Sequence, residues 1–218
     1  MKTITRDEYL FMARGDPDYY KGGEGLWQSR VAVCCEWLQA IPAEPERVLE
    51  IGPYMTPLVP GSAILDLPKR APLHQGRRFI AHDASKTPWP LRTGEFEIVI
   101  ACAVWEHLHR NETGAFQEAA RVAAWMLMLV PYEWARHNDQ WHNGVDVGVI
   151  SRWTGGITPV RARKLGRAGW QTWLALYDLA AVTGRARCPE CARLPVGGDP
   201  LLKCAYCGYA RELTAVQG

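Results

Sequence analysis

The sequence predicts an α/β fold with a doubly wound, mostly parallel sheet, followed by a small cysteine-rich segment. Short apolar runs rich in Val and Ile recur between residues 47 and 131, helical segments alternate with them, and two CxxC pairs stand near the C-terminus. Near-continuous apolar runs indicate strands buried on both faces, as in a parallel sheet. A chain of 218 residues suffices for one such domain and an appendage, which we assign to residues 1–185 and 186–218.

The composition indicates a folded protein of the cytoplasm. Hydrophobic residues make up 48% of the chain, enough for a buried core, and the net charge of +2 excludes no class of partner. The N-terminal sequence MKTITRDEYLFMARGD has no apolar stretch of the kind found in signal peptides. No apolar run approaches the roughly 18 residues of a membrane span, so we expect no membrane association.

Five apolar runs are expected to form the strands, and helices are expected around them. Leu26 to Ile41 has an apolar stripe at helical spacing, in which Cys34 and Cys35 are expected to be packing residues. The segment from Asn111 to Ala124 is a second predicted helix. The predicted strands are Arg47–Gly52, Ala63–Leu67, Arg78–Asp83, Phe96–Val104 and Trp125–Pro131.

The last part of the predicted domain is less regular. The sequence RARKLGRAG, residues 161–169, predicts a helix that ends at a glycine. Residues 170–182 fit both strand and helix spacing, and we predict a strand followed by a short helix.

Polar residues stand where the predicted strands end. Glu50 and Gly52 end the first strand, Asp66 the second and Asp83 the third, while Glu106 and His107 follow the fourth. Open α/β sheets bind ligands at the carboxyl ends of their strands. A strand-end aspartate is by itself more often a cap, but the ordered series predicts a nucleotide-type site.

These segments resemble class I S-adenosylmethionine (AdoMet)-dependent methyltransferases over roughly residues 45–176. VLEIGPYMTPLVPG is similar to the family's first motif, AILDL to its ribose-binding strand and FIAHDASKTPWPL to its adenine-binding loop. EFEIVIACAVWEHL resembles its fourth strand, and RKLGRAGW its late helix. The resemblance implies AdoMet as the cofactor and methyl transfer as the activity.

The resemblance also implies roles for single residues. Glu50 and Gly52 would lie under the methionine part of AdoMet, Asp66 on the ribose, and Asp83 with Ala84 near the adenine. The segment 101–103 would border the sulfonium; its middle residue, Cys102, also fits the role of a small core residue. Tyr54 stands where the family usually has a second glycine of the cofactor loop.

The two CxxC pairs predict a zinc ribbon. Four thiolates in two turns can enclose one tetrahedral Zn²⁺, and such a closed site is structural rather than catalytic. A redox CxxC would need only one pair at the start of a helix. The predicted ligands are Cys188, Cys191, Cys204 and Cys207.

The loop from Pro131 to Asp146 follows the predicted fifth strand and is expected to border the methyl acceptor. His137 and His142 in this loop, or His107, are candidates for the general base. The alternative interpretation is an ordinary polar loop in which these histidines have no catalytic role. The sequence lacks the NPPY-type motif and the Pro-Cys nucleophile of DNA base methyltransferases.

We therefore expect methyl transfer to an oxygen or nitrogen nucleophile of a small-molecule or RNA acceptor. The alternative is a catalytically silent methyltransferase-like module that binds nucleic acid or protein. Such a module would use the zinc ribbon and the segment 152–193, which is rich in arginine. The sequence indicates no particular oligomeric state.

The zinc ribbon predicts the effect of losing one ligand. Cys204→Ser should lower the zinc content from about one ion per chain to near zero and unfold the C-terminal tail, because metal binding supplies the folding energy of so short a segment. Elemental analysis of the purified variant measures this, with Cys35→Ser as a control outside the CxxC pairs. Unchanged zinc content in Cys204→Ser would contradict the ribbon.

Overall fold

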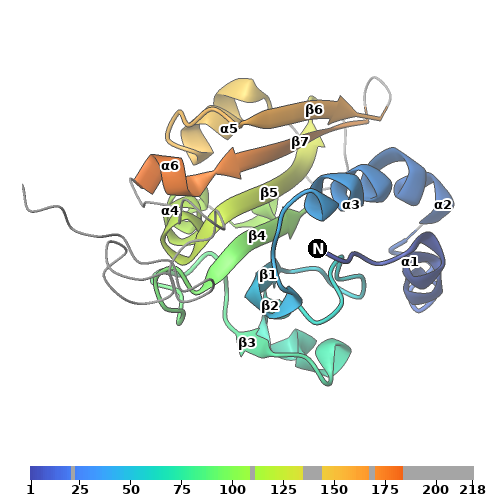
Figure 1. Ribbon diagram of the computed structural model, residues 1–218. Coiled ribbons are helices and arrows are strands. Elements are labelled where there is room, and N and C mark those ends of the chain that lie inside the picture. The colour runs from blue at the N-terminus through green and yellow to red at the C-terminus, as the bar shows by residue number, and fades with distance from the viewer. Residues whose placement is uncertain (21–22, 109–110, 135–143, 167–169, 184–218) are drawn as a thin grey trace, which may run out of the picture.

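The computed structural model describes residues 1–20, 23–108, 111–134, 144–166 and 170–183. Its centre is a seven-stranded sheet with the strand order β3-β2-β1-β4-β5-β7-β6. Strands β1 to β5 are parallel, and β7 runs antiparallel to both β5 and β6 (Figure 1). The order reverses between β1 and β4, so the carboxyl tips of these two strands form the switch point where ligands bind in such sheets.

The strands confirm all five runs that the sequence predicts. The central strands are buried because helices cover both faces, which explains why their sequences lack a polar alternation. The strands are β1 (Val48–Ile51), β2 (Ala63–Asp66), β3 (Phe79–Ala81), β4 (Phe96–Cys102), β5 (Ala123–Tyr132), β6 (Arg161–Leu165) and β7 (Gln171–Asp178).

Helices lie on both sides of the sheet. Helices α1 and α3 pack on one face and α4, α5 and α6 on the other, so α3 and α4 lie on opposite sides (Figure 1). The α-helices are α1 (Arg6–Ala13), α2 (Gly23–Leu26), α3 (Ala32–Gln39), α4 (Glu112–Val122), α5 (Val147–Trp153) and α6 (Leu179–Thr183). Shorter turns are η1 (Trp27–Val31), η2 (Pro45–Arg47), η3 (Pro68–His74) and η4 (Trp105–His107).

The predicted helix from Leu26 to Ile41 is confirmed, with one irregularity. Its first part, η1, is a π-helical turn that joins α2 to α3. Cys34 and Cys35 belong to α3 and their side chains are buried, as their expected packing role requires. A π-turn inserts one residue and so rotates the side chains on one side of it relative to a regular α-helix.

The helix predicted over residues 161–169 is wrong, because Arg161 to Leu165 form the edge strand β6. Only Leu165 of this strand is buried, so its sequence has no apolar alternation to reveal it. Arg161 packs on the Trp37 ring and Lys164 on the Tyr132 ring, at 4.2 and 4.3 Å from the ring centres. The strand and short helix predicted over 170–182 are confirmed as β7 and α6.

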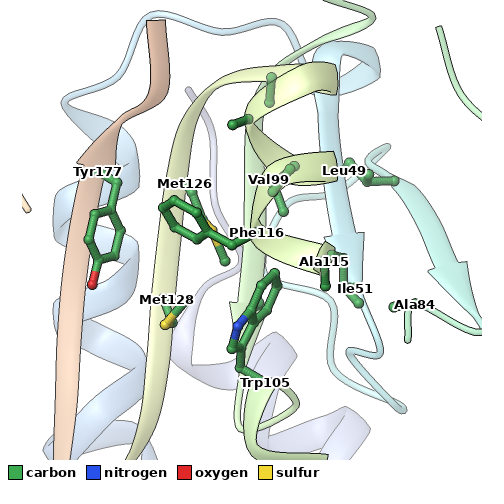
Figure 2. Packing of buried hydrophobic residues seen from close by; sticks show 14 of the residues in the cluster. Leu49, Ile51, Ala84, Val99, Trp105, Ala115, Phe116, Met126, Met128 and Tyr177 are labelled. Carbon is green, nitrogen blue, oxygen red and sulfur yellow. The ribbon is translucent and has the colours of Figure 1, made fainter. Parts of the chain in front are cut away.

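The core beneath α4 is held by aromatic side chains. Phe116 of α4 lies edge-on to the Trp105 ring at 6.5 Å and to the Tyr177 ring of β7 at 5.4 Å (Figure 2). Edge-to-face geometry of this kind is favourable beyond the area it buries. Phe116 therefore links α4, the turn after β4, and β7.

The proposed C-terminal segment, 186–218, lies outside the described residues. In the part of the chain that the structure describes, no helix combines the length and the apolar character that a membrane crossing requires.

Phe116→Ala should lower the free energy of unfolding by about 3–5 kcal/mol, since it removes a buried ring and leaves a cavity. Urea denaturation monitored by circular dichroism measures the change. Phe11, of which 74% is exposed, supplies the matched control: Phe11→Ala should cost less than about 0.5 kcal/mol. Equal losses in both variants would show that the core under α4 is not organised around Phe116.

Candidate active site

The tips of three neighbouring strands bring the predicted carboxylates to one edge of the sheet. Glu50 belongs to β1, Asp66 ends β2, and Asp83 follows β3. The parallel register places Asp66 beside Ala81, two residues before Asp83. The three carboxylates face different surroundings, and only Asp66 and Asp83 are partly exposed.

Glu50 supports the loop that follows β1. Its carboxylate accepts hydrogen bonds from the amides of Leu58 and Val59, at 2.7 and 2.9 Å, and from the Ser62 hydroxyl at 2.7 Å. The residue is 1% exposed, and this burial raises the pKa of the carboxyl group, against the lowering effect of the three donors. Glu50 thus fixes the return of the loop, and its contact with a cofactor stays a prediction.

Gly52 makes the close turn out of β1. Its φ is +54°, and a Cβ built on it would lie 2.8 Å from Cγ2 of Val104 in the segment after β4. A side chain at this position would therefore push apart the loops after β1 and β4. The glycine keeps the backbone of the two central strand tips close together, as a cofactor cradle requires.

Tyr54 occupies a left-handed backbone position without being a glycine. Its φ is +50°, so the chain keeps the turn that a glycine would make, at a cost of about 1 kcal/mol or more. The Tyr54 hydroxyl donates to Asp16 at 2.7 Å, and the ring lies 4.6 Å from that of Tyr19. Arg70, from η3 after β2, lies over the same ring at 4.3 Å. Tyr54 therefore ties the loops after β1 and β2 to the N-terminal segment.

A buried histidine, His74, lies next to the carboxylate of Asp66. His74 is 3% exposed, stacks on Phe79 at 5.6 Å, and places Nε2 3.8 Å from Oδ2 of Asp66. Within the described residues, this Nε2 atom has no hydrogen-bond partner. Burial lowers the pKa of His74, against the opposing effect of Asp66, so the ring is neutral at pH 7. The other oxygen of Asp66 accepts from the amide of Leu67 at 2.7 Å.

Asp83 organises the loop after β3. One of its oxygens accepts from both the amide and the hydroxyl of Ser85, at 2.9 and 2.7 Å. Burial opposes ionisation of Asp83, but these hydrogen bonds outweigh it and leave the pKa below its usual value. Ala84 is buried, and its carbonyl accepts from Nε1 of Trp89 at 3.0 Å.

The tips of β4 and β5 also carry strained residues. Ala103 follows β4 with φ of +54°, and Glu133 follows β5 with φ of +53°. Together with Tyr54, they are the non-glycine residues with positive φ in the described chain, and all three follow central parallel strands. Strained backbone of this kind clusters at functional sites.

Cys102 ends β4 on the face that α3 covers. A hydrogen bond with Cys34 of α3, and burial, raise the pKa of the Cys102 thiol. The side chain thus belongs to the packing between sheet and helix, as one of the two sequence interpretations expects. Its predicted contact with the cofactor is untested.

Only one of the three predicted bases lies within the described residues. His107 lies in η4 after β4, beside the buried Glu106, whereas His137 and His142 lie outside the described residues. Asp146, at the end of the same loop, caps α5 by accepting from the amide of Val149 at 2.8 Å. The four predicted zinc ligands also lie outside, and the described ranges hold no cluster of metal-ligating side chains.

Arg30 and Trp134 lie close to each other after the tip of β5, a proximity that the strand-end pattern does not reveal. Arg30 lies on η1, and its guanidinium carbon is 5.7 Å from the centre of the Trp134 ring, just after β5. In the sequence, Arg30 is one polar position of a helix, and only the π-turn and the docking of the N-terminal helices place it at the sheet edge. No local sequence signal marks it.

The described residues fit an adenosyl group at the tips of β1 to β3. Gly52 makes a close turn after β1. Asp66 ends β2, and His74 lies 3.8 Å from one of its carboxylate oxygens. In the turn after β3, the pKa of Asp83 is lowered. Ribose hydroxyls donate to carboxylates at this place in wound sheets. AdoMet has no pyrophosphate, so a loop with Tyr54 in place of a glycine is compatible with the cofactor.

The sheet order, with β7 inserted antiparallel next to β5, is that of the class I methyltransferase fold. A SAM-dependent methyltransferase from Thermotoga maritima has this fold, with a TM-score of 0.55 and 8% identity over 79% of this chain and 98% of its own. A chain of the Haloferax volcanii complex between the Trm112 methyltransferase activator and a methyltransferase gives 0.53 and 13%, over 79% and 97%.

A SAM-dependent methyltransferase from Aquifex aeolicus gives a TM-score of 0.50 at 11% identity, over 79% of this chain and 98% of its own. No protein-family model and no curated protein sequence matches the chain. At these identities the likeness shows the fold alone.

The buried histidine predicts a dependence of stability on pH. The unfolded chain takes up a proton at His74 below about pH 6.5, whereas the folded protein keeps the ring neutral to lower pH. The free energy of unfolding should therefore fall between pH 7 and pH 5.5, by at most about 1.4 kcal/mol per pH unit from this residue. Urea denaturation across this range, compared with His74→Leu, measures the contribution. An equally steep loss in the variant would show that other groups cause it.

Proposed function

We propose that this protein transfers a methyl group from AdoMet to an oxygen or nitrogen atom of a small-molecule or RNA acceptor. The observation that carries the proposal is the order of partly exposed polar groups along the strand tips of a class I methyltransferase fold. A wound sheet alone would not suffice, because one fold serves many functions.

The cofactor would be held by residues from three loops. Asp66 would accept the ribose hydroxyls, Asp83 and Ala84 would border the adenine, and Gly52 would give room for the methionine part. AdoMet, when bound, supplies the activated methyl group. Tyr54, through its hydrogen bond to Asp16 and its contact with Arg70, would hold the N-terminal segment over this site.

The chain's own contribution to methyl transfer is alignment and proton removal. The strained tips of β4 and β5 fix the backbone beside the position where the acceptor would lie. His107 in η4, or His137 or His142 in the loop after β5, would accept the acceptor's proton. Of the three, His107 is the candidate that lies within the described residues, in the turn η4 after β4.

Zinc is a second proposed cofactor, with a structural role. The donor set of four cysteines in the 186–218 segment, Cys188, Cys191, Cys204 and Cys207, matches a closed tetrahedral thiolate site. Thiolate coordination requires reducing conditions, which agrees with a location in the cytoplasm.

The alternative, a silent nucleic-acid or protein-binding module based on residues 152–193, has weaker support. Two of the basic side chains of β6 already have partners: Arg161 pairs with Glu36 and Trp37, and Lys164 with Glu133 and Tyr132. Arg163 remains exposed on this edge strand. In the described part of the segment, these pairings reduce the positive charge that β6 can offer to a phosphate.

Asp66→Ala should weaken the binding of S-adenosylhomocysteine, the demethylated cofactor, by at least about tenfold, because it removes charge-assisted hydrogen bonds to the ribose. Isothermal titration calorimetry measures the dissociation constant. Asp7→Ala serves as the control, since the Asp7 side chain is 90% exposed on α1; this variant should bind as the wild type does.

Wild-type protein that binds neither AdoMet nor S-adenosylhomocysteine would contradict methyl transfer. Salt-sensitive RNA binding that persists in Asp66→Ala, without cofactor binding, would support the alternative module. Mass spectrometry of the reaction products would separate methyl transfer from other chemistry that uses AdoMet.

A further inference from the structure

The buried ring of His74 lies between the tip of β2 and strand β3. His74 ends η3, the turn that connects these two strands, and its ring stacks on Phe79 of β3 with 5.6 Å between the ring centres. Phe79 pairs with Ile64, two residues before Asp66, so Asp66 and Phe79 point to the same face of the sheet. The fold therefore holds His74 against the carboxylate that would bind the ribose.

The Nε2 atom of His74 is a buried polar atom without a hydrogen-bond partner among the residues that the structure describes. The side chain is 1% exposed, so solvent has almost no access to it. Oδ2 of Asp66 lies 3.8 Å away, and a shift of about 1 Å would give a normal hydrogen-bond distance. Leaving a buried donor unpaired costs about 1–3 kcal/mol, whereas a hydrogen bond to a charged oxygen is favourable. Nε2 is thus placed for a bond to Asp66.

The surroundings of His74 keep its ring neutral. Burial is the main cause that lowers its pKa, and Asp66 acts against it. The guanidinium groups of Arg77 and Arg70 add to the lowering. A neutral imidazole carries its single proton on Nε2 or on Nδ1, and a carboxylate oxygen near Nε2 favours the proton there. His74 can therefore donate to Asp66 without neutralising the negative charge that would attract the ribose hydroxyls.

The two oxygens of Asp66 are held unequally. Oδ1 accepts a hydrogen bond from the amide of Leu67 at 2.7 Å, whereas the described residues donate no hydrogen bond to Oδ2. Within the described ranges, His74 is also the only basic side chain at ion-pair distance from Asp66. Two ribose hydroxyls that bind one carboxylate need both of its oxygens in a fixed plane, and a donor at Oδ2 would fix that plane.

Packing alone does not explain a histidine at this position. A phenylalanine or leucine side chain would fill similar space against Phe79 without placing a polar atom in the interior. Burial of a polar group is unfavourable unless the group finds a partner. The imidazole therefore indicates a role for Nε2, and Asp66 is the acceptor within reach.

We propose that His74 is a positioning residue of the cofactor site, whose Nε2–H group donates to Oδ2 of Asp66 when the ribose hydroxyls bind the same carboxylate. This inference rests on the proposed function and deepens it, because recognition of the ribose then depends on a residue that does not touch the cofactor. His74 itself is too deeply buried to reach the ribose. No bond breaks, and no proton leaves either residue.

The first test needs no variant. In protein labelled with ¹⁵N at histidine, NMR shows which ring nitrogen of His74 carries the proton and whether this N–H group enters a hydrogen bond. With S-adenosylhomocysteine, the proton should lie on Nε2 and its resonance should move downfield, whereas adenine, which has no ribose, should leave it in place. A proton on Nδ1 in the complex, an unchanged resonance, or an equal shift with adenine would overturn the inference.

The second test compares two substitutions at this one position. His74→Phe keeps an aromatic ring on Phe79 but removes the donor, so S-adenosylhomocysteine should bind about tenfold more weakly. His74→Gln restores an N–H donor at similar reach and should bind within about threefold of the wild type. Isothermal titration calorimetry measures the affinities, and thermal melts verify folding.

Equal weakening in His74→Phe and His74→Gln would assign His74 a purely structural role and contradict the proposal. Unchanged binding in His74→Phe would contradict it as well. If His74→Phe does not fold, the spectra of the wild-type protein decide.

The third test isolates the ribose hydroxyls. Adenosine and 2′,3′-dideoxyadenosine differ only in these groups, and displacement of S-adenosylhomocysteine measures both affinities. The wild type should prefer adenosine by at least about tenfold, and His74→Phe should reduce this preference severalfold while binding the dideoxy compound within about twofold of the wild type. An unchanged preference would refute the role of His74 and leave methyl transfer standing. Failure of the wild type to bind S-adenosylhomocysteine would instead contradict the proposed function itself.

Discussion

The hydrogen bonds of Glu50 fix the loop on which the candidate site depends. This carboxylate is enclosed by the fold and accepts from the amides of Leu58 and Val59 and from the Ser62 hydroxyl. The loop therefore leaves β1, returns over its tip and enters β2 in one defined path. Within this path Gly52 turns so close to the segment after β4 that an added Cβ would lie 2.8 Å from Cγ2 of Val104.

The backbone is also constrained where the strands next to β1 end. Tyr54, Ala103 and Glu133 all adopt left-handed backbone after central strands, which holds their loops in place at a local energetic cost. Such strain persists only where the surrounding packing over-determines the conformation, as the buried sheet does here. The candidate site is thus formed by rigid strand ends, and the buried His74 lies next to Asp66 at one of them.

The central part of the fold was predictable because burial on both faces leaves a strong pattern. The runs that became β1, β4 and β5 are apolar apart from Glu50 and Glu97, and the carboxylates at the ends of β1, β2 and β3 fall in the predicted order. The edge strand β6 was not predictable, because only Leu165 of its five residues is buried. Its register is instead set by pairing with β7 and by the packing of Arg161 and Lys164 on aromatic rings.

The sequence by itself determined the wound sheet, its class and the chemical character of the strand tips, because these depend on local periodicity and on residues that end each strand. Tertiary structure decided what each polar residue does. Glu50 and Asp66 are alike in sequence, yet one is buried by its own loop and the other stays partly open beside His74. Arg30 has no counterpart in any local pattern, because its position results from a π-turn and from helices docking across a sheet edge that is distant in sequence.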